Sequence, residues 1–125
     1  MASGRRILVV EDNPEIGEMI TAVLGQEGYL VTLVQSEAAA VAALAAGRYD
    51  LVLADTLADL TLGERRWAAV ERIRAAAHRT PIIICTAHNP SHFAEFAARG
   101  FSGLIAKPFD LDDLLRPIAR LLVTR

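Results

Sequence analysis

The sequence has little of what marks a secreted, membrane or nucleic-acid-binding protein. Its single cysteine, Cys85, excludes an internal disulfide, and a free thiol inside an apolar run favours a reducing compartment. No apolar run approaches the roughly 18 residues of a membrane span. Only four apolar residues follow Arg6 before the first acid, too few for a signal-peptide core. These features favour a cytoplasmic protein without a membrane partner.

Basic residues are outnumbered, and lysine is nearly missing. Thirteen Lys and Arg against fifteen Asp and Glu give a net charge of −2, without a basic block to neutralise a row of phosphates. Nucleic acid is therefore not expected as a direct partner. Lys107 is the single lysine, and the other twelve basic residues are arginine. Because arginine is used wherever else a basic residue occurs, the lysine at position 107 is a candidate functional residue.

The length and composition predict one globular domain over residues 1–125. At 125 residues the chain fits the usual size of a single domain, and 53% hydrophobic residues are enough to bury a core. There is no repeat, linker or low-complexity segment.

Five short apolar runs alternate with segments whose apolar residues recur at helical spacing. The runs predict buried strands at 7–10, 30–34, 51–54, 81–85 and 103–106. The segments between and after them predict five helices, among them a short fourth helix opened by Asn89 and Pro90 and ended by Arg99 and Gly100. Asp110 is expected to cap the last helix. This alternation predicts an α/β fold, a doubly wound parallel sheet with helices on both faces.

In such sheets the functional site lies beyond the carboxyl ends of the strands. Glu11 and Asp12 follow the first strand, Asp55 the third, Thr86 the fourth and Lys107 the fifth. Three carboxylates in one crevice repel each other unless a cation lies among them, and oxygen ligands favour a hard ion such as Mg²⁺. A lysine and a hydroxyl facing them suit a phosphoryl group. Asp55 is the best-placed nucleophile.

The chain resembles the receiver domain of bacterial two-component response regulators from Ile7 to Leu122. Four stretches carry the resemblance: ILVVEDNP at 7–14, DLVLAD at 50–55, PIIICTA at 81–87 and AKPFD at 106–110. The resemblance implies a flavodoxin-like sheet of strand order 2-1-3-4-5 with five helices. It also implies that residues 1–125 form a single receiver domain.

The resemblance assigns roles to individual residues. It implies a Mg²⁺ site made by the side chains of Glu11, Asp12 and Asp55 and the backbone carbonyl of Leu57. Asp55 would be the phosphoryl acceptor, Thr86 would donate its hydroxyl to a phosphoryl oxygen, and Lys107 would pair with the phosphoryl group. Ala87 would leave room beside it, and the bond before Pro108 would be cis.

A regulatory domain rather than a metabolic enzyme is implied, one that catalyses its own phosphorylation and dephosphorylation at Asp55. The donor would be a phosphohistidine on a sensor histidine kinase or a phosphotransfer protein. Phosphorylation would shift the face formed by the fourth helix, fifth strand and fifth helix, controlling a downstream protein or an output domain. The same face is a candidate for phosphorylation-linked dimerisation.

Several positions depart from the family pattern. Leu104 stands three residues before the lysine, where the family has Tyr or Phe, and Phe101 lies close to it in sequence. Asp59 replaces a common proline in the loop after Asp55, whereas Gly63 matches the family glycine at the start of the third helix. The fifth strand follows Gly-Phe-Ser-Gly at 100–103, which lacks the paired acids of receivers that dimerise by charge.

Three alternatives stay open. A receiver-like module could bind a protein without phosphorylation. A hydrolase using Asp55 as a transient nucleophile is disfavoured, because such phosphatases usually need a cap domain or a second acid where Leu57 stands. A zinc site from Cys85, His88 and His92 has loosely suitable spacing, but offers only three ligands and places one of them in a buried strand.

Three aromatic residues admit two interpretations. Trp67, Phe93 and Phe96 lie at helical spacing in predicted helices. They would form either an exposed recognition patch or part of the core. Their spacing favours the core.

Overall fold

The computed structural model describes residues 4–56, 66–87 and 89–122, which fold around one parallel sheet. Its five strands lie in the order β2-β1-β3-β4-β5, and every neighbouring pair is parallel. The strands are β1 (Arg6–Val10), β2 (Leu30–Val34), β3 (Leu51–Asp55), β4 (Ile82–Thr86) and β5 (Gly103–Ala106). The predicted sheet and its order are confirmed, and each strand lies within one residue of its expected position.

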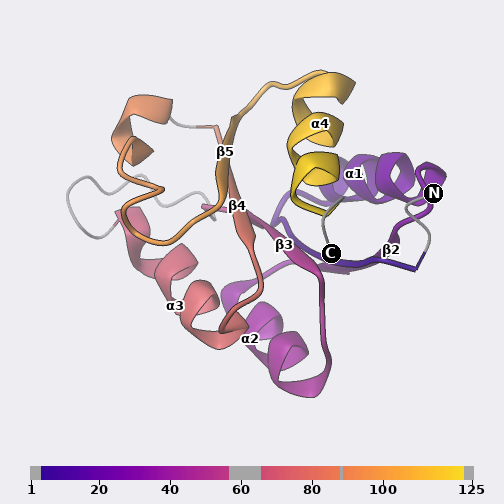
Figure 1. The fold of residues 1–125 in the computed structure, drawn as a ribbon, viewed down its shortest axis with the longest axis horizontal. Helices are drawn as coiled ribbons and strands as arrows, with labels where there is room; N and C mark the ends of the chain where they lie inside the picture. Colours follow the sequence, from indigo (N-terminus) through magenta and orange to yellow (C-terminus); the bar gives the residue numbers. More distant parts are fainter. Residues whose placement is uncertain (1–3, 57–65, 88, 123–125) are drawn as a thin grey trace.

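In the described residues, four α-helices cover the sheet, two on each face (Figure 1). On one face lie α1 (Pro14–Gln26) and α4 (Leu111–Leu122), and on the other α2 (Glu37–Ala46) and α3 (Ala68–Ala77). Each pair of helices covers its own apolar cluster, because alternate residues of a strand point to opposite sides.

Odd-numbered strand residues belong to one cluster and even-numbered strand residues to the other. The α1/α4 cluster is built around Ile7, Val9, Leu51, Leu53, Ile83, Cys85 and Ile105, with Ile20, Leu24, Leu114 and Ile118 from the helices. The α2/α3 cluster is built around Leu8, Val10, Val52, Ala54, Ile82 and Ile84, with Trp67, Val70, Ile73, Phe93 and Phe101. Burial on both faces explains why the central strands have continuous apolar sequences.

Local sequence signals set the ends of α1. The side-chain Oδ1 of Asn13 accepts hydrogen bonds from the backbone N–H groups of Glu15 and Ile16, at 3.0 and 3.1 Å. Pro14 takes the first helical position, where its missing N–H leaves no bond unmade. After the helix, Gly28 adopts a φ of +92°, which favours glycine, and turns the chain towards β2.

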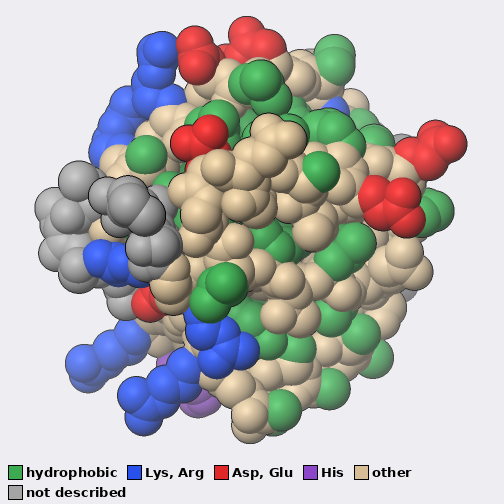
Figure 2. Space-filling model, turned by 90° about the vertical axis from the view of Figure 1, so that its right-hand side faces the viewer, with side chains coloured by type: hydrophobic (Ala, Val, Ile, Leu, Met, Phe, Trp, Pro, Cys, Tyr) green, Lys and Arg blue, Asp and Glu red, His purple; other side chains and the backbone are tan. Residues whose placement is uncertain are grey.

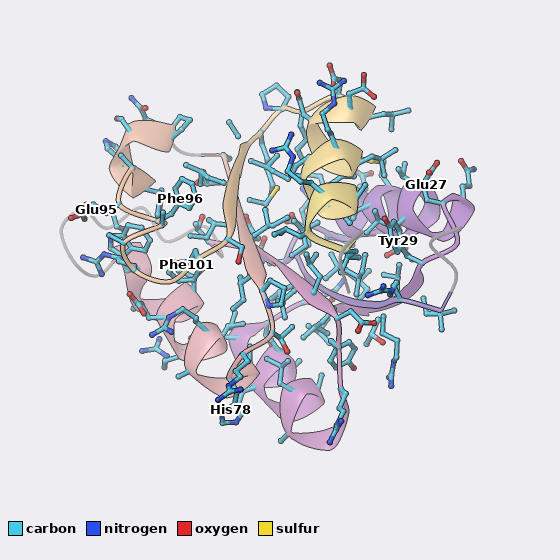
Figure 3. The ribbon with its side chains drawn as sticks, in the orientation of Figure 1. Glu27, Tyr29, His78, Glu95, Phe96 and Phe101 are labelled. Carbon is cyan, nitrogen blue, oxygen red and sulfur yellow. The ribbon has the colours of Figure 1, made fainter. Side chains whose placement is uncertain are left out.

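The predicted fourth helix is wrong: the residues described between β4 and β5, Ala87 and 89–102, form no α-helix. The segment begins as a 3₁₀ helix, η2 (Pro90–Phe93), and continues through hydrogen-bonded turns to Gly100. Most of its backbone bonds span three residues, as from the Phe96 N–H to the Phe93 carbonyl at 3.1 Å. A three-residue repeat puts Phe93 and Phe96 on one side, while Glu95 points outward (Figure 3). A segment this short has only a weak tendency to form an α-helix, and the packing of the two phenylalanine rings outweighs that tendency.

The aromatic residues of this region are core residues. Trp67 and Phe93 are each 1% exposed, and Phe96 is half-buried against the α2/α3 cluster. The Trp67 ring meets Phe93 edge-on with centroids 5.0 Å apart and stacks on Phe101 at 5.8 Å. The guanidinium carbon of Arg99 lies 4.4 Å from the Trp67 ring centroid. The core interpretation is confirmed, and these rings fasten residues 90–101 to the start of α3.

The surface on the side of α1 and β2 carries charges of both signs (Figure 2). Basic side chains gather along the left edge of this view, and most acidic ones lie at its top and right. Across the described ranges, no helix combines the length and apolar character needed to cross a bilayer.

Candidate functional site at the carboxyl edge of the sheet

The residues expected at the strand ends come together at one edge of the sheet. Asp55 ends β3, Thr86 ends the neighbouring β4, and Glu11 follows β1 directly. The backbone N–H of Lys107 donates to the Thr86 carbonyl at 2.8 Å, which extends the pairing of β5 with β4 by one step. Four different strands therefore supply the side chains of this site.

Glu11, Asp12 and Asp55 form a cluster of carboxylates. One oxygen from each lies within 4.8 Å of the others, and no other such group of His, Cys, Asp or Glu occurs in the described part of the chain. Glu11 is 2% exposed and Asp55 5%, whereas Asp12 is exposed. Glu11 Oε2 accepts a hydrogen bond from the backbone N–H of Asn13 at 3.1 Å. This bond ties the carboxylate to the start of α1.

Lys107 faces two of these carboxylates at once. Its Nζ lies 2.6 Å from Glu11 Oε1 and 3.1 Å from Asp55 Oδ1. Burial lowers the pKa of the Lys107 ammonium, but the hydrogen bond to Glu11 and the charge of Asp55 outweigh this effect, so the pKa is raised. The lysine therefore stays charged at neutral pH. The bond between Lys107 and Pro108 is cis, as the family resemblance implied.

The surroundings of Asp55 change the proton affinity of its carboxyl group. Burial raises the pKa of Asp55 to about 6; Lys107 opposes this rise, while the charges of Glu11 and Asp12 add to it. Three carboxylates and one ammonium leave two negative charges uncompensated when all are ionised. A divalent cation would balance them, and an all-oxygen donor set suits a hard ion. The residues present fit Mg²⁺.

A second hydroxyl accompanies the expected one. Thr86 is fully buried, and its Oγ1 lies 3.4 Å from Oγ1 of Thr56, which is 2% exposed. Thr56 directly follows Asp55 in the chain. Sequence reasoning selected Thr86 and missed Thr56, because a contact between side chains of two strand ends leaves no pattern along the chain. The one available signal was a polar residue immediately after the candidate nucleophile.

Three expected features lie outside the described residues: the backbone carbonyl of Leu57, Asp59 and Gly63.

Ala87 is exposed beside the site. With Lys107 it lines an apolar cleft of about 440 Å³, whose other walls are Ile16, Met19, Pro108 and Phe109. The small alanine side chain thus leaves an opening next to the lysine.

The zinc alternative gains no support from the geometry. Cys85 is 1% exposed, and burial raises the pKa of its thiol to about 12. Zinc binds the deprotonated thiolate, which this environment disfavours. His92 is exposed, and His88 lies outside the described residues.

Leu104 takes the place of the family's aromatic residue on the face that holds the α2/α3 cluster. It pairs with Ile84 of β4 and is half-buried. Phe101 is 4% exposed and stacked on Trp67, so its ring belongs to the core before β5 begins (Figure 3). Phe101 is therefore not a substitute for a ring at position 104.

Comparison with known proteins identifies the family. The family model described as the response regulator receiver domain matches residues 7–119. The chain therefore belongs to the receiver domains of response regulators, as its sequence motifs indicated. Its place among regulatory domains of two-component systems follows from this membership.

Individual relatives agree with this assignment. The transcriptional regulatory protein DltR of Streptococcus agalactiae is 36% identical over 114 residues, which cover 90% of this chain and 50% of DltR. The chain spans about half the length of these curated relatives, which include the regulatory proteins PcoR of Escherichia coli and TcrA of Mycobacterium tuberculosis. These relatives therefore contain a further region beyond the part that matches.

Two solved structures share the fold and contain magnesium. The receiver domain of the sensor histidine kinase PA1611 from Pseudomonas aeruginosa is 35% identical with a TM-score of 0.79, covering 97% of this chain and 99% of its own. Its structure has a magnesium ion coordinated in the active site cleft. The response regulator TrrA from Thermotoga maritima, in complex with Mg²⁺ and BeF, is 29% identical with a TM-score of 0.76, covering 94% and 99% of the two chains.

Proposed function

We propose that this chain is a phosphorylation-dependent switch in which Asp55 accepts a phosphoryl group from phosphohistidine. The observation that carries the proposal is the position of Lys107 Nζ, 3.1 Å from Asp55 Oδ1, at an edge where Thr86 also ends its strand. A nucleophilic oxygen, a fixed cation and a hydroxyl donor are together what phosphoryl transfer requires of a protein.

Mg²⁺ completes this proposal. The side chains of Glu11, Asp12 and Asp55 would hold the ion, together with the backbone carbonyl of Leu57. When bound, the ion supplies positive charge against the phosphoryl oxygens. The magnesium in the PA1611 and TrrA structures and the oxygen-only donor set of this chain support the assignment.

The transfer step balances without another reactant. A carboxylate oxygen of Asp55 forms a bond to phosphorus while the P–N bond of phosphohistidine breaks. The electron pair of that bond stays on the ring nitrogen, which leaves as neutral imidazole when the other ring nitrogen carries the proton. Lys107 pairs with the new phosphoryl group, and the Thr86 hydroxyl donates a hydrogen bond to one of the phosphoryl oxygens. Hydrolysis of the acyl phosphate at the same site would return the switch to rest.

The partners follow from the same chemistry. The donor would be a sensor histidine kinase or a phosphotransfer protein, and the receiver would act on a downstream protein or an output domain. The relatives named as transcriptional regulatory proteins support an output of that kind. The output face would comprise residues 90–101, β5 and α4, and would also carry any phosphorylation-linked dimer. We place this single receiver domain, residues 1–125, in the cytoplasm.

Intact-mass spectrometry after incubation with acetyl phosphate tests the proposal directly. We expect the mass to increase by one phosphoryl group when Mg²⁺ is present, and no increase without it. Asp55→Asn should abolish the gain because it removes the nucleophilic oxygen. Asp112→Asn, an exposed change in α4, serves as the matched control and should leave the gain unchanged.

Two results would count against the proposal. Labelling that persists in Asp55→Asn would place the acceptor elsewhere. Failure of the unaltered protein both to gain a phosphoryl group and to bind beryllofluoride would favour a module that binds its partner without phosphorylation. Beryllofluoride is included because some receivers accept phosphate only from a kinase.

A further inference from the structure

The hydroxyl of Thr56 has one partner in the described part of the chain, the hydroxyl of Thr86. Both threonines are at least 98% buried, so water does not readily satisfy either hydroxyl. Thr56 follows the proposed phosphoryl acceptor, and Thr86 ends the adjacent strand. The contact therefore links the residue that directly follows the reacting carboxylate to the residue that ends the neighbouring strand.

The number of hydroxyl protons determines which threonine is the donor in this contact after phosphorylation. Each threonine hydroxyl carries one proton and can accept through its lone pairs. In the resting site either hydroxyl can be the donor. Once Thr86 donates its proton to a phosphoryl oxygen, the bond between the threonines can be made only by the proton of Thr56. The two hydroxyls then form a chain that runs from Thr56 through Thr86 to the phosphoryl group.

We propose that Thr56 is a positioning residue, which donates to Thr86 and thereby directs the Thr86 proton towards the phosphoryl group on Asp55. This inference rests on the proposed function of Asp55. Thr56 acts through Thr86 and does not itself touch the reacting atoms.

The spacing of the pair makes this effect specific to the phosphorylated state. At 3.4 Å the two oxygens are farther apart than the about 2.7 to 2.8 Å of a strong hydroxyl bond, so the resting contact is loose. A hydroxyl that donates a bond to an anion becomes a better acceptor, because successive hydrogen bonds polarise one another. The contact therefore strengthens when the phosphoryl group arrives. An interaction that is stronger in the product than at rest favours formation of that product.

Beryllofluoride binding to the full chain, with Mg²⁺ and followed by fluorine NMR, tests the inference. Thr56→Val removes the hydroxyl and nearly keeps the volume, and it should weaken binding about fivefold, the effect of one ordinary hydrogen bond. Thr56→Ser restores the hydroxyl and should bind like the unaltered protein. Thr80→Val is the matched control, because Thr80 Oγ1 donates to the Tyr49 carbonyl at 3.3 Å, away from the site.

A double variant separates positioning from a general loss of stability. Thr86→Val should weaken binding more than Thr56→Val, and adding Thr56→Val to it should cause no further loss. The inference is overturned if Thr56→Val weakens binding equally in both backgrounds, if serine fails to restore binding, or if Thr56→Val binds like the unaltered protein. If the unaltered protein neither binds beryllofluoride nor takes up a phosphoryl group, the proposed function itself fails and the role of Thr56 fails with it.

Discussion

Lys107 and Glu11 are 96 positions apart in sequence, and their side chains meet at 2.6 Å. Glu11 is 2% exposed, and its carboxylate accepts hydrogen bonds from Lys107 and from the backbone N–H of Asn13. The same ammonium also meets Asp55 at 3.1 Å. One cation thus serves two buried carboxylates, and its removal affects both stability and chemistry.

We expect Lys107→Ala to lower the free energy of unfolding by about 1 to 3 kcal/mol in metal-free buffer, because two carboxylates lose a charged hydrogen-bond donor. Added Mg²⁺ should reduce this deficit, since the ion supplies the missing positive charge. The variant should keep its fold by circular dichroism and lose phosphoryl uptake. Thermal unfolding with and without Mg²⁺ measures the stability change.

Arg116→Ala is the control for removing a basic residue from an exposed ion pair. Arg116 lies 3.5 Å from Asp112, and both side chains are mostly exposed. We expect its stability to change by no more than about 0.5 kcal/mol. Equal effects of the Lys107 and Arg116 variants would contradict a structural role for the buried lysine.

The raised pKa of Asp55 predicts an unusual dependence of stability on pH. The folded carboxyl titrates at about 6 and its ordinary pKa is 3.8, so the folded protein binds the proton more tightly than the unfolded chain does. The contribution of Asp55 to stability is therefore present at low pH and is lost as the pH rises from about 4 to about 6. Urea unfolding without divalent cations should show this fall.

Asp55→Asn should remove the same pH dependence. Above pH about 6 the variant should be more stable than the unaltered protein by roughly 2 to 3 kcal/mol, and the gap should close towards pH about 4. Mg²⁺ should also reduce the gap, because it stabilises the ionised carboxylate. A gap that stays constant across this pH range would show that the Asp55 carboxyl is not perturbed.

Trp67 is the single tryptophan, and its fluorescence reports on the packing of residues 90–101. Phe93→Ala should destabilise the protein by about 3 to 5 kcal/mol, because it removes a buried ring beside the indole. The emission of Trp67 should shift to the red as water gains access. Phe109→Ala, which alters the α1/α4 side of the sheet, should leave the emission unchanged. An unchanged spectrum in Phe93→Ala would contradict the ring contact.

The sheet and most of the site could be predicted because their signals are local. β4 is apolar up to its last residue (Thr86), Asn13 and Pro14 mark a helix start, and the candidate site residues lie where the strands end. Alternation of strands and helices then leaves few arrangements of the sheet, and these arrangements place Asp55 and Lys107 at one edge.

What could not be predicted depends on contacts between distant side chains. The segment after Pro90 has helical signals in its sequence, but the packing of Phe93 and Phe96 gives it a three-residue repeat. The contact of Thr56 with Thr86 arises from the register of β3 against β4, which no spacing along the chain reveals. Predicting such features requires knowledge of how the helices and strands are placed relative to one another, and sequence periodicity does not give this.

The parity of the strands places the two halves of the site on opposite sides of the sheet. Asp55 shares the parity of Leu51 and Leu53, which meet α1 and α4, whereas Thr86 shares that of Ile82 and Ile84, which meet α2 and α3. A phosphoryl group attached to Asp55 and held by Thr86 would link the two faces of the sheet. The apolar clusters on these faces have no described residue in common. A change at this edge would therefore reach the helices on both faces of the sheet.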